Sequence, residues 1–178
     1  TLGTLASVCA SLPLLAQTPP NDTFPGETPL AGHVHVVTGA NVGATSEAGE
    51  PNHADSPATA SIWWSWVAPD SGLALVSTLG TTFDTVLAVY TGDAVNALTL
   101  VAANDDAPGL ATSLVSFQAV QGATYRIAVD GYGGATGPIE LRLGLPGPPT
   151  PPVITSQPIG QTVPDNAGSN VTFTVSVT

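Results

Sequence analysis

The sequence FDTVLAVYTGDAVNALTLVAANDD, from Phe83 to Asp106, contains two apolar runs joined by a short polar connection. In the first run the side chains alternate between two sets, Val86, Ala88 and Tyr90 against Thr85, Leu87 and Val89. Successive side chains of a strand point to opposite faces, so this run predicts a strand. Thr91-Gly92-Asp93 has turn chemistry, and Leu98 to Ala103 is a second apolar run. The stretch therefore predicts a β-hairpin.

Acidic and amide side chains lie at the outer ends of this hairpin. Asp84 precedes the first strand, and Asn104-Asp105-Asp106 follows the second. The start of one hairpin strand and the end of the other meet at the same end of the sheet, so these side chains are expected to converge. Asp130 ends a later predicted strand and is expected to join them.

Calcium is bound in proteins by six to eight oxygens from carboxylates, amides and backbone carbonyls. The five residues therefore predict a Ca²⁺ site of the weak kind found in extracellular modules: Asp84, Asn104, Asp105, Asp106 and Asp130. The alternative interpretation is that these side chains only end their strands, through local hydrogen bonds to the backbone.

A weaker metal hypothesis concerns the long segment between residues 39 and 60. Loops of this length without periodicity are usually functional or disordered. Glu47, Glu50 and His53 recur there at intervals of three residues, which resembles a ligand set. The alternative is that Glu50 and His53 clamp the loop over the sheet by hydrogen bonds.

The charge balance excludes one class of partner. Lys and Arg total 2 against 13 Asp and Glu, which gives a net charge of −11. Such a chain lacks the basic surface that phosphate backbones and anionic lipids require, so nucleic acid is excluded as a partner. Cations are the natural partners of so acidic a chain.

The rest of the chain predicts an all-β fold. Short apolar runs are separated by 19 Gly and 17 Pro, and few segments combine helix formers over ten residues. Ser61 to Ala68 is the most apolar run, with Ile62, Trp64 and Trp66 facing a core and Trp63 facing the long loop. Aromatic rows also bind sugar rings, but a Trp-rich strand favours core packing. About eight short strands predict one antiparallel β-sandwich or jelly roll.

Both ends of the chain differ in composition from this domain. Residues 1–20 contain an apolar run around Cys9 that is typical of the end of a secretory signal. The Pro-rich residues 17–30 predict a linker that leads into a domain starting near Asn21. A genuine terminus that packs on the domain is the alternative. The run is too short to span a bilayer, which needs about 20 residues. We expect a secreted or cell-surface protein without a membrane span.

The carboxyl-terminal end follows a second Pro-rich linker at residues 146–152, PGPPTPP. Residues 153–178 contain a perfectly alternating run whose apolar set is Val171, Phe173, Val175 and Val177. About 26 residues cannot bury a core of their own. We therefore expect either the first strands of another β-sandwich or an interaction strand that a neighbouring molecule completes.

Ordered short motifs give the chain a resemblance to a known family. The motifs are Asn21-Asp22-x-Phe24, GANVGAT from Gly39, EAGEPNH from Glu47, WWSW, FDTVLAVYTG, NDD and AVDGY. Residues 21–145 resemble the pre-peptidase C-terminal (PPC-like) β-sandwich domains of bacterial secreted proteins, and the tail resembles the start of an immunoglobulin-like domain. The resemblance implies a non-catalytic binding, adhesion or spacer module, with calcium bound in some relatives.

The sequence has no motif for catalysis. The nucleophile elbow, the H-E-x-x-H zinc motif and the phosphate-binding glycine loop are all missing from it, so we expect no enzyme activity. Two hypotheses remain. The first is an accessory module whose partners are other domains of the same polypeptide, carbohydrate or a cell surface. The second is a filament subunit that adds a β-strand to its neighbours.

Overall fold

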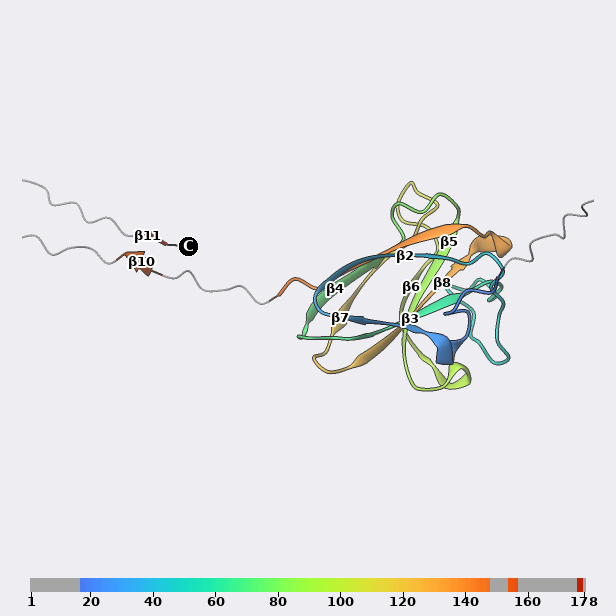
Figure 1. Ribbon diagram of the computed structural model, residues 1–178, viewed down its shortest axis with the longest axis horizontal. Helices are drawn as coiled ribbons and strands as arrows, with labels where there is room; N and C mark the ends of the chain where they lie inside the picture. The colour runs from blue at the N-terminus through green and yellow to red at the C-terminus, as the bar shows by residue number, and fades with distance from the viewer. Residues whose placement is uncertain (1–16, 148–153, 157–175, 178) are drawn as a thin grey trace, which may run out of the picture. The chain divides into compact units, whose positions relative to one another are not determined.

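The computed structural model describes residues 17–147, 154–156 and 176–177, and the chain divides into two compact units, Thr1–Gly147 and Pro148–Thr178. Residues 17–147 of the larger unit form nine strands and three short 3₁₀ turns (Figure 1). The fold is all-β, as the sequence predicts. Among the described residues no helix is long and apolar enough to cross a membrane.

The nine strands form two sheets, and all pairings except that of β1 with β3 are antiparallel. The five-stranded sheet has the order β1 (Thr28–Ala31), β3 (Ile62–Val67), β8 (Thr124–Gly131), β5 (Thr85–Thr91) and β6 (Thr99–Asn104). The four-stranded sheet has the order β2 (Val34–Ala40), β9 (Pro138–Gly144), β4 (Gly72–Ser77) and β7 (Leu114–Ala119). This arrangement is a β-sandwich.

The main core lies between the two sheets. It takes alternate residues from strands of both, and its large buried side chains include Trp64, Trp66, Phe117, Tyr125 and Ile127. Burial of a large aromatic or aliphatic side chain stabilises a fold by about 1.5–3 kcal/mol, so these residues dominate its stability. The assignment of Ile62, Trp64 and Trp66 to the core is confirmed.

A second, smaller cluster covers the opposite face of the five-stranded sheet. Trp63 lies there at 0% exposure, with Phe24, Tyr90 and the ring of His53 around it. His53 belongs to the long loop between β2 and β3, so Trp63 faces that loop as expected. Both faces of β5 are consequently buried, whereas β6, the second strand of the predicted hairpin, lies at the edge of the sheet and is largely exposed.

The hairpin itself is confirmed. β5 and β6 pair antiparallel with Leu87 opposite Asn104, and the 3₁₀ turn η2 (Val95–Ala97) lies in the connection between them. Asp84 and Asp105 therefore lie just beyond the same end of the pair, close to the last residues of β8 (Gly131 is opposite Thr85). This end of the sheet carries the candidate site.

The amino-terminal entry differs from the expectation. Residues 17–30 read as a Pro-rich linker, yet the 3₁₀ turn η1 (Phe24–Gly26) and strand β1 lie within or at the end of this segment. Leu30 is buried in the main core, and Pro29 is tolerated because β1 is an edge strand. Packing of Leu30 and Phe24 thus determines the structure of a segment whose composition favours a linker.

The smaller unit contains one described strand pair. β10 (Ile154–Ser156) pairs antiparallel with β11 (Ser176–Val177). Val177 of the predicted interaction strand lies in β11, whereas Val171, Phe173 and Val175 lie outside the described residues.

Candidate metal site

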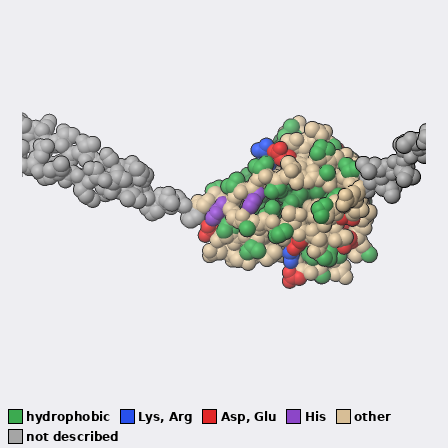
Figure 2. Space-filling model, viewed as in Figure 1, with side chains coloured by type: hydrophobic (Ala, Val, Ile, Leu, Met, Phe, Trp, Pro, Cys, Tyr) green, Lys and Arg blue, Asp and Glu red, His purple; other side chains and the backbone are tan. Residues whose placement is uncertain are grey.

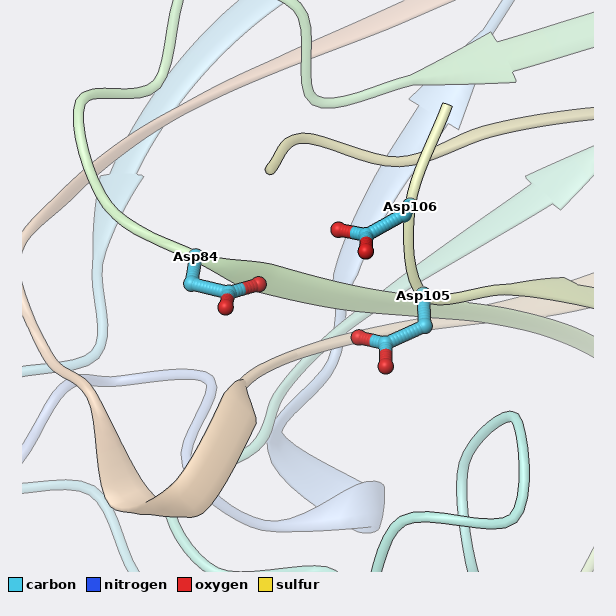
Figure 3. A group of neighbouring side chains, drawn as sticks. All are labelled: Asp84, Asp105 and Asp106. Atoms are coloured by element: carbon cyan, nitrogen blue, oxygen red, sulfur yellow. The ribbon is translucent and has the colours of Figure 1, made fainter. Parts of the chain in front are cut away.

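Three carboxylates converge at the end of the β5–β6 pair. Asp84 precedes β5, and Asp105 and Asp106 follow β6. One oxygen from each carboxylate lies within 4.8 Å of the others, and Figure 3 shows the three side chains facing a common space. Two of the residues are partly buried and Asp106 is exposed, so the space opens to solvent on one side. We call Asp84, Asp105 and Asp106 the aspartate cluster.

A buried group of hydroxyls positions this cluster. Thr85 at the start of β5 contacts Ser113 (3.1 Å) and Thr78 (2.6 Å) through their hydroxyl oxygens, and all three residues are 0% exposed. The Ser113 hydroxyl also lies 2.8 Å from the carbonyl oxygen of Asp105. The three buried hydroxyls thus join the start of β5, next to Asp84, to the segment that contains Asp105. They fix the spacing of Asp84 and Asp105.

The carboxylates repel one another. Partial burial raises the pKa of Asp84, and the charge of Asp106 raises it further. Burial also raises the pKa of Asp105, as do the charges of Asp106 and Asp84. One oxygen of Asp84 and one of Asp105, Oδ1 in each case, are enclosed by protein and have no hydrogen-bond partner within the described part of the chain. An enclosed carboxylate oxygen without a partner is costly, because it has lost its hydration.

Both basic side chains of the protein are engaged elsewhere. Arg126 pairs with Glu27 and with Asp93, and Arg142 pairs with Glu140. Figure 2 shows each basic side chain beside acidic ones. Since the chain has no further Lys or Arg, the aspartate cluster has no basic side chain that could neutralise it.

Asn104 and Asp130 have other roles in this structure. Asn104 donates to the carbonyl of Asp106 (3.0 Å) and accepts from the N–H of Leu114 (2.9 Å), so it stabilises the turn that carries the cluster. Asp130 is 2% exposed, and its carboxylate accepts from the backbone N–H groups of Thr59, Ala60 and Gly131 at 2.7–2.9 Å. The cluster contains neither residue.

Glu47, Glu50 and His53 form a hydrogen-bonded loop clamp. Glu50 accepts from the N–H of Glu47 (2.7 Å) and from the Ser61 hydroxyl, and it contacts Nε2 of His53 (3.1 Å). Glu47 accepts from the N–H of Phe24. Burial alone would raise the pKa of Glu50, but the hydrogen bonds from His53, Ser61 and Glu47 together hold it below its ordinary value. The arrangement matches the clamp interpretation.

His53 extends this clamp to β5. Its Nδ1 lies 2.8 Å from the Tyr90 hydroxyl oxygen, and this hydroxyl donates its hydrogen to the carbonyl of Asn52 (3.1 Å). Burial raises the pKa of Tyr90, and the nearby charge of Glu50 raises it further, so the tyrosine remains a hydrogen-bond donor. These contacts hold the long loop on the five-stranded sheet, beside the aspartate cluster.

A hollow that the sequence does not predict adjoins the cluster. Asp105 lies in it, with residues 54–57 of the long loop on one side and Tyr132 and Gly133 on the other. Tyr132 belongs to the 3₁₀ turn η3 (Tyr132–Gly134), and its N–H donates to the carbonyl of Asp84 (3.0 Å). The only signal in the sequence is an aromatic residue within the glycine-rich segment Gly131–Gly134.

Comparison with known proteins adds no assignment. A scan against protein-family models finds no match to this chain, and a search of the curated proteins finds no relative.

Proposed function

We propose that residues 21–145 form a non-catalytic, extracellular β-sandwich module that binds Ca²⁺ at Asp84, Asp105 and Asp106. The observation that carries the proposal is the convergence of three carboxylates without a basic partner; two of their oxygens are enclosed and have no hydrogen-bond partner among residues 17–147. A bound cation would satisfy these oxygens and remove the repulsion that raises the pKa values of Asp84 and Asp105.

The type of oxygen ligand favours calcium over other cations. Carboxylates are hard ligands, which suit Ca²⁺ and Mg²⁺ rather than zinc or copper. Mg²⁺ requires a near-ideal octahedron, whereas Ca²⁺ accepts irregular sets of six to eight oxygens. A cluster at loop ends, partly open to solvent, therefore supports calcium with a dissociation constant of about 10⁻⁴–10⁻³ M, the range of extracellular modules.

The module's place in a larger protein rests on the sequence. The signal-like residues 1–20, the Pro-rich linker at 146–152 and the resemblance of residues 21–145 to PPC-like domains all support a secreted, multidomain protein. In such a protein the module would act in adhesion or as a spacer beside other domains, with the immunoglobulin-like segment following it. Calcium would stabilise the module after secretion.

Thermal unfolding in calcium and in EGTA tests this proposal. About 10 mM calcium should stabilise the wild type by about 1.4–2.7 kcal/mol, because ligand binding to the folded state lowers its free energy. The melting temperature should rise by roughly 3–10 °C. Asp105→Asn should lose this shift, since it removes an enclosed ligand oxygen.

Asp70→Asn is the matched control for this experiment. Asp70 lies in the turn between β3 and β4, at the opposite end of the five-stranded sheet from the cluster. The substitution makes the same change in charge, so the calcium shift should persist. Equal shifts in all three proteins, or no shift in the wild type, would contradict a site at the aspartate cluster.

A second candidate function, a filament subunit assembled by strand addition, is favoured by strand β2. β2 is an edge strand of the four-stranded sheet, and Val34 and Val36 on it are 71% and 59% exposed. A groove beside it is lined by residues of β2, by the amino-terminal entry and by Trp64. An exposed apolar edge is a template for another strand.

Electron microscopy of negatively stained protein tests this alternative. If a carboxyl-terminal strand adds to β2 of a neighbour, the full chain should form filaments and deletion of residues 153–178 should abolish them. Val36→Lys, which places a charge on the receiving edge, should have the same effect. Monomeric full-length chain would rule the filament out and leave the module hypothesis.

A further inference from the structure

Strand β2 has a row of free backbone groups along one side. It pairs with β9 over its whole length without a register shift. Two bonds at the ends of this ladder fix its phase. Leu145 donates to the carbonyl of His33 (2.7 Å), and Asn41 donates to the carbonyl of Gly137 (3.2 Å). Because hydrogen-bonded residues alternate in an antiparallel pair, the odd-numbered residues of β2 bond to β9. The N–H and C=O groups of the even-numbered residues therefore point to the open edge: Val34, Val36, Thr38 and Ala40.

The other three sheet edges carry features that discourage the addition of a strand. β1 is only four residues long and contains Pro29, which has no N–H to donate. β6 has a register shift where it pairs with β5. At the start of β7, the Asn104 side chain accepts from the N–H of Leu114 (2.9 Å). β2 has no such feature, because its sequence VHVVTGA contains no proline, acidic residue, lysine or arginine and its ladder is regular.

The charge of this edge suits the approach of a second copy of the chain. Each chain carries a net charge of −11, so repulsion opposes most contacts between copies. β2 adds no acidic side chain, and the two charged residues of the neighbouring β9, Glu140 and Arg142, form an ion pair with each other. The exposed side chains Val34 and Val36 are apolar. Two β2 edges can therefore meet without bringing unpaired carboxylates together.

We propose that β2 pairs antiparallel with β2 of a second copy about a two-fold axis at Val37, which joins two four-stranded sheets into one continuous sheet. The free residues lie symmetrically about Val37. In this register Val36 meets Thr38 of the second copy, and Val34 meets Ala40. Every free N–H and C=O of the edge then has a partner, which no other symmetric register achieves. The pairing does not depend on the calcium site.

Side-chain sizes are complementary in this register. On the outer face Val34 lies opposite Ala40 of the second copy, and on the inner face His35 lies opposite Gly39. A larger side chain thus meets a smaller one on each face. The groove that Gly39 helps to line lies beside the contact, so the second copy would cover part of its apolar surface. Burial of this surface adds to the hydrogen bonds along the strands.

This pairing closes the assembly. Both copies use the same edge, and a contact of that kind forms a dimer and stops there. The filament hypothesis requires β2 to receive a different strand from each neighbour, which would leave the assembly open. The dimer and the filament therefore compete for one edge and can be distinguished by the size of the assembly.

Size-exclusion chromatography with light scattering of the full chain tests the proposal. The wild type should have twice the mass of one chain at high concentration and dissociate on dilution, in calcium and in EGTA alike. Val36→Lys should weaken association by roughly tenfold or more, because it places two lysines diagonally across the axis and beside Arg142. Leu100→Lys is the matched control. Leu100 is 55% exposed on the edge strand β6, so this variant should dimerise like the wild type.

Cysteine cross-linking tests the register. In a Cys9→Ser background, Val37→Cys places two thiols opposite each other at the axis, and mild oxidation should link the two chains. Val34→Cys is the control. Val34 is 71% exposed, so random collisions would favour it, but in the proposed register it lies far from Val34 of the second copy and should remain unlinked.

Several outcomes would overturn the dimer. A monomer at every concentration would do so, as would a dimer that Val36→Lys leaves intact or a link through Val34→Cys in place of Val37→Cys. Filaments that require residues 153–178 would also overturn it, because they would occupy the same edge. None of these results bears on the calcium site, which is measured by its own heat of binding.

Discussion

Asp105 makes opposite contributions to stability with and without calcium. In the described part of the chain its enclosed Oδ1 has no hydrogen-bond partner, and the charges of Asp106 and Asp84 lie nearby. Without an ion, these features favour the protonated acid in the folded state, which is why the pKa of Asp105 is raised. With an ion, the same features favour the carboxylate. The Asp105 side chain thus makes the stability of the domain depend on whether calcium is bound.

The pH dependence of Asp105→Asn in EGTA follows from this raised pKa. From the ordinary value of 3.8 up to the folded pKa, the folded state binds more protons than the unfolded state, so wild-type stability rises as pH falls. Above the folded pKa the carboxylate is ionised in both states, and the repulsion is fully present. Asp105→Asn should therefore be more stable than the wild type at pH 7, by about 0.5–1 kcal/mol.

Urea unfolding at several pH values between roughly 3.5 and 7 measures the free energy of unfolding of both proteins. This range begins near the ordinary pKa of an aspartic acid and extends upward, because the folded pKa of Asp105 is raised. The advantage of Asp105→Asn should shrink toward zero as pH falls to the ordinary pKa of an aspartic acid. Asp70→Asn serves as the control. The wild-type Asp70 carboxylate has a partner, His33 at 2.7 Å, and lies away from the aspartate cluster, so its removal should not relieve the repulsion within the cluster. An Asp105→Asn protein that is less stable than the wild type in EGTA at pH 7 would show that the carboxylate has a stabilising partner.

At the scale of elements, Asp130 joins the long loop to the end of β8. Three backbone N–H groups and the Thr59 hydroxyl donate to its carboxylate, which is almost wholly buried. The contacts connect the loop immediately before β3 with the neighbouring strand. Asp130 is therefore a structural residue of the sheet end that carries the aspartate cluster.

Asp130→Ala should lower the free energy of unfolding by about 3–5 kcal/mol, because it leaves three backbone donors without an acceptor. Urea unfolding measures this loss. The calcium-induced rise in melting temperature should persist in the folded fraction, in contrast to Asp105→Asn. A folded Asp130→Ala protein that no longer responds to calcium would instead place Asp130 among the ligands.

The hairpin and its acidic end could be predicted because both depend on local sequence. Alternation specifies the strands β5 and β6, and antiparallel pairing brings Asp84 to Asp105 and Asp106. In the sequence Asp130 resembles the residues of the aspartate cluster, because it also lies at the end of a strand. Its carboxylate turns toward Thr59 and Ala60, which are about 70 residues away in sequence, and no local pattern records that contact.

The same limit applies to β1 and to the hollow. β1 forms because Leu30 packs in the core beside a strand that follows more than 30 residues later, against a composition that favours a linker. The hollow requires Tyr132 to lie opposite residues 54–57, which depends on the clamp of Glu50 and His53. Tertiary contacts of this kind override local propensity.

At the scale of the whole molecule, most of the acidic side chains form contacts that stabilise the fold. The chain has 13 acidic residues and only two arginines, yet most described carboxylates have a hydrogen bond or an ion pair, as Asp22 does with Thr45 and Glu27 with Arg126. The aspartate cluster stands out because its carboxylates are close together and have no such partner within the described residues. The unpaired negative charge is thus concentrated in the aspartate cluster, at one end of the sandwich.

Titration calorimetry of the full chain with calcium tests the central claim most directly. The account predicts one ion per chain with a dissociation constant of about 10⁻⁴–10⁻³ M. It also predicts loss of this heat in Asp105→Asn and its retention in Asp70→Asn. No heat in the wild type, or the same heat in Asp105→Asn, would contradict a calcium site at Asp84, Asp105 and Asp106.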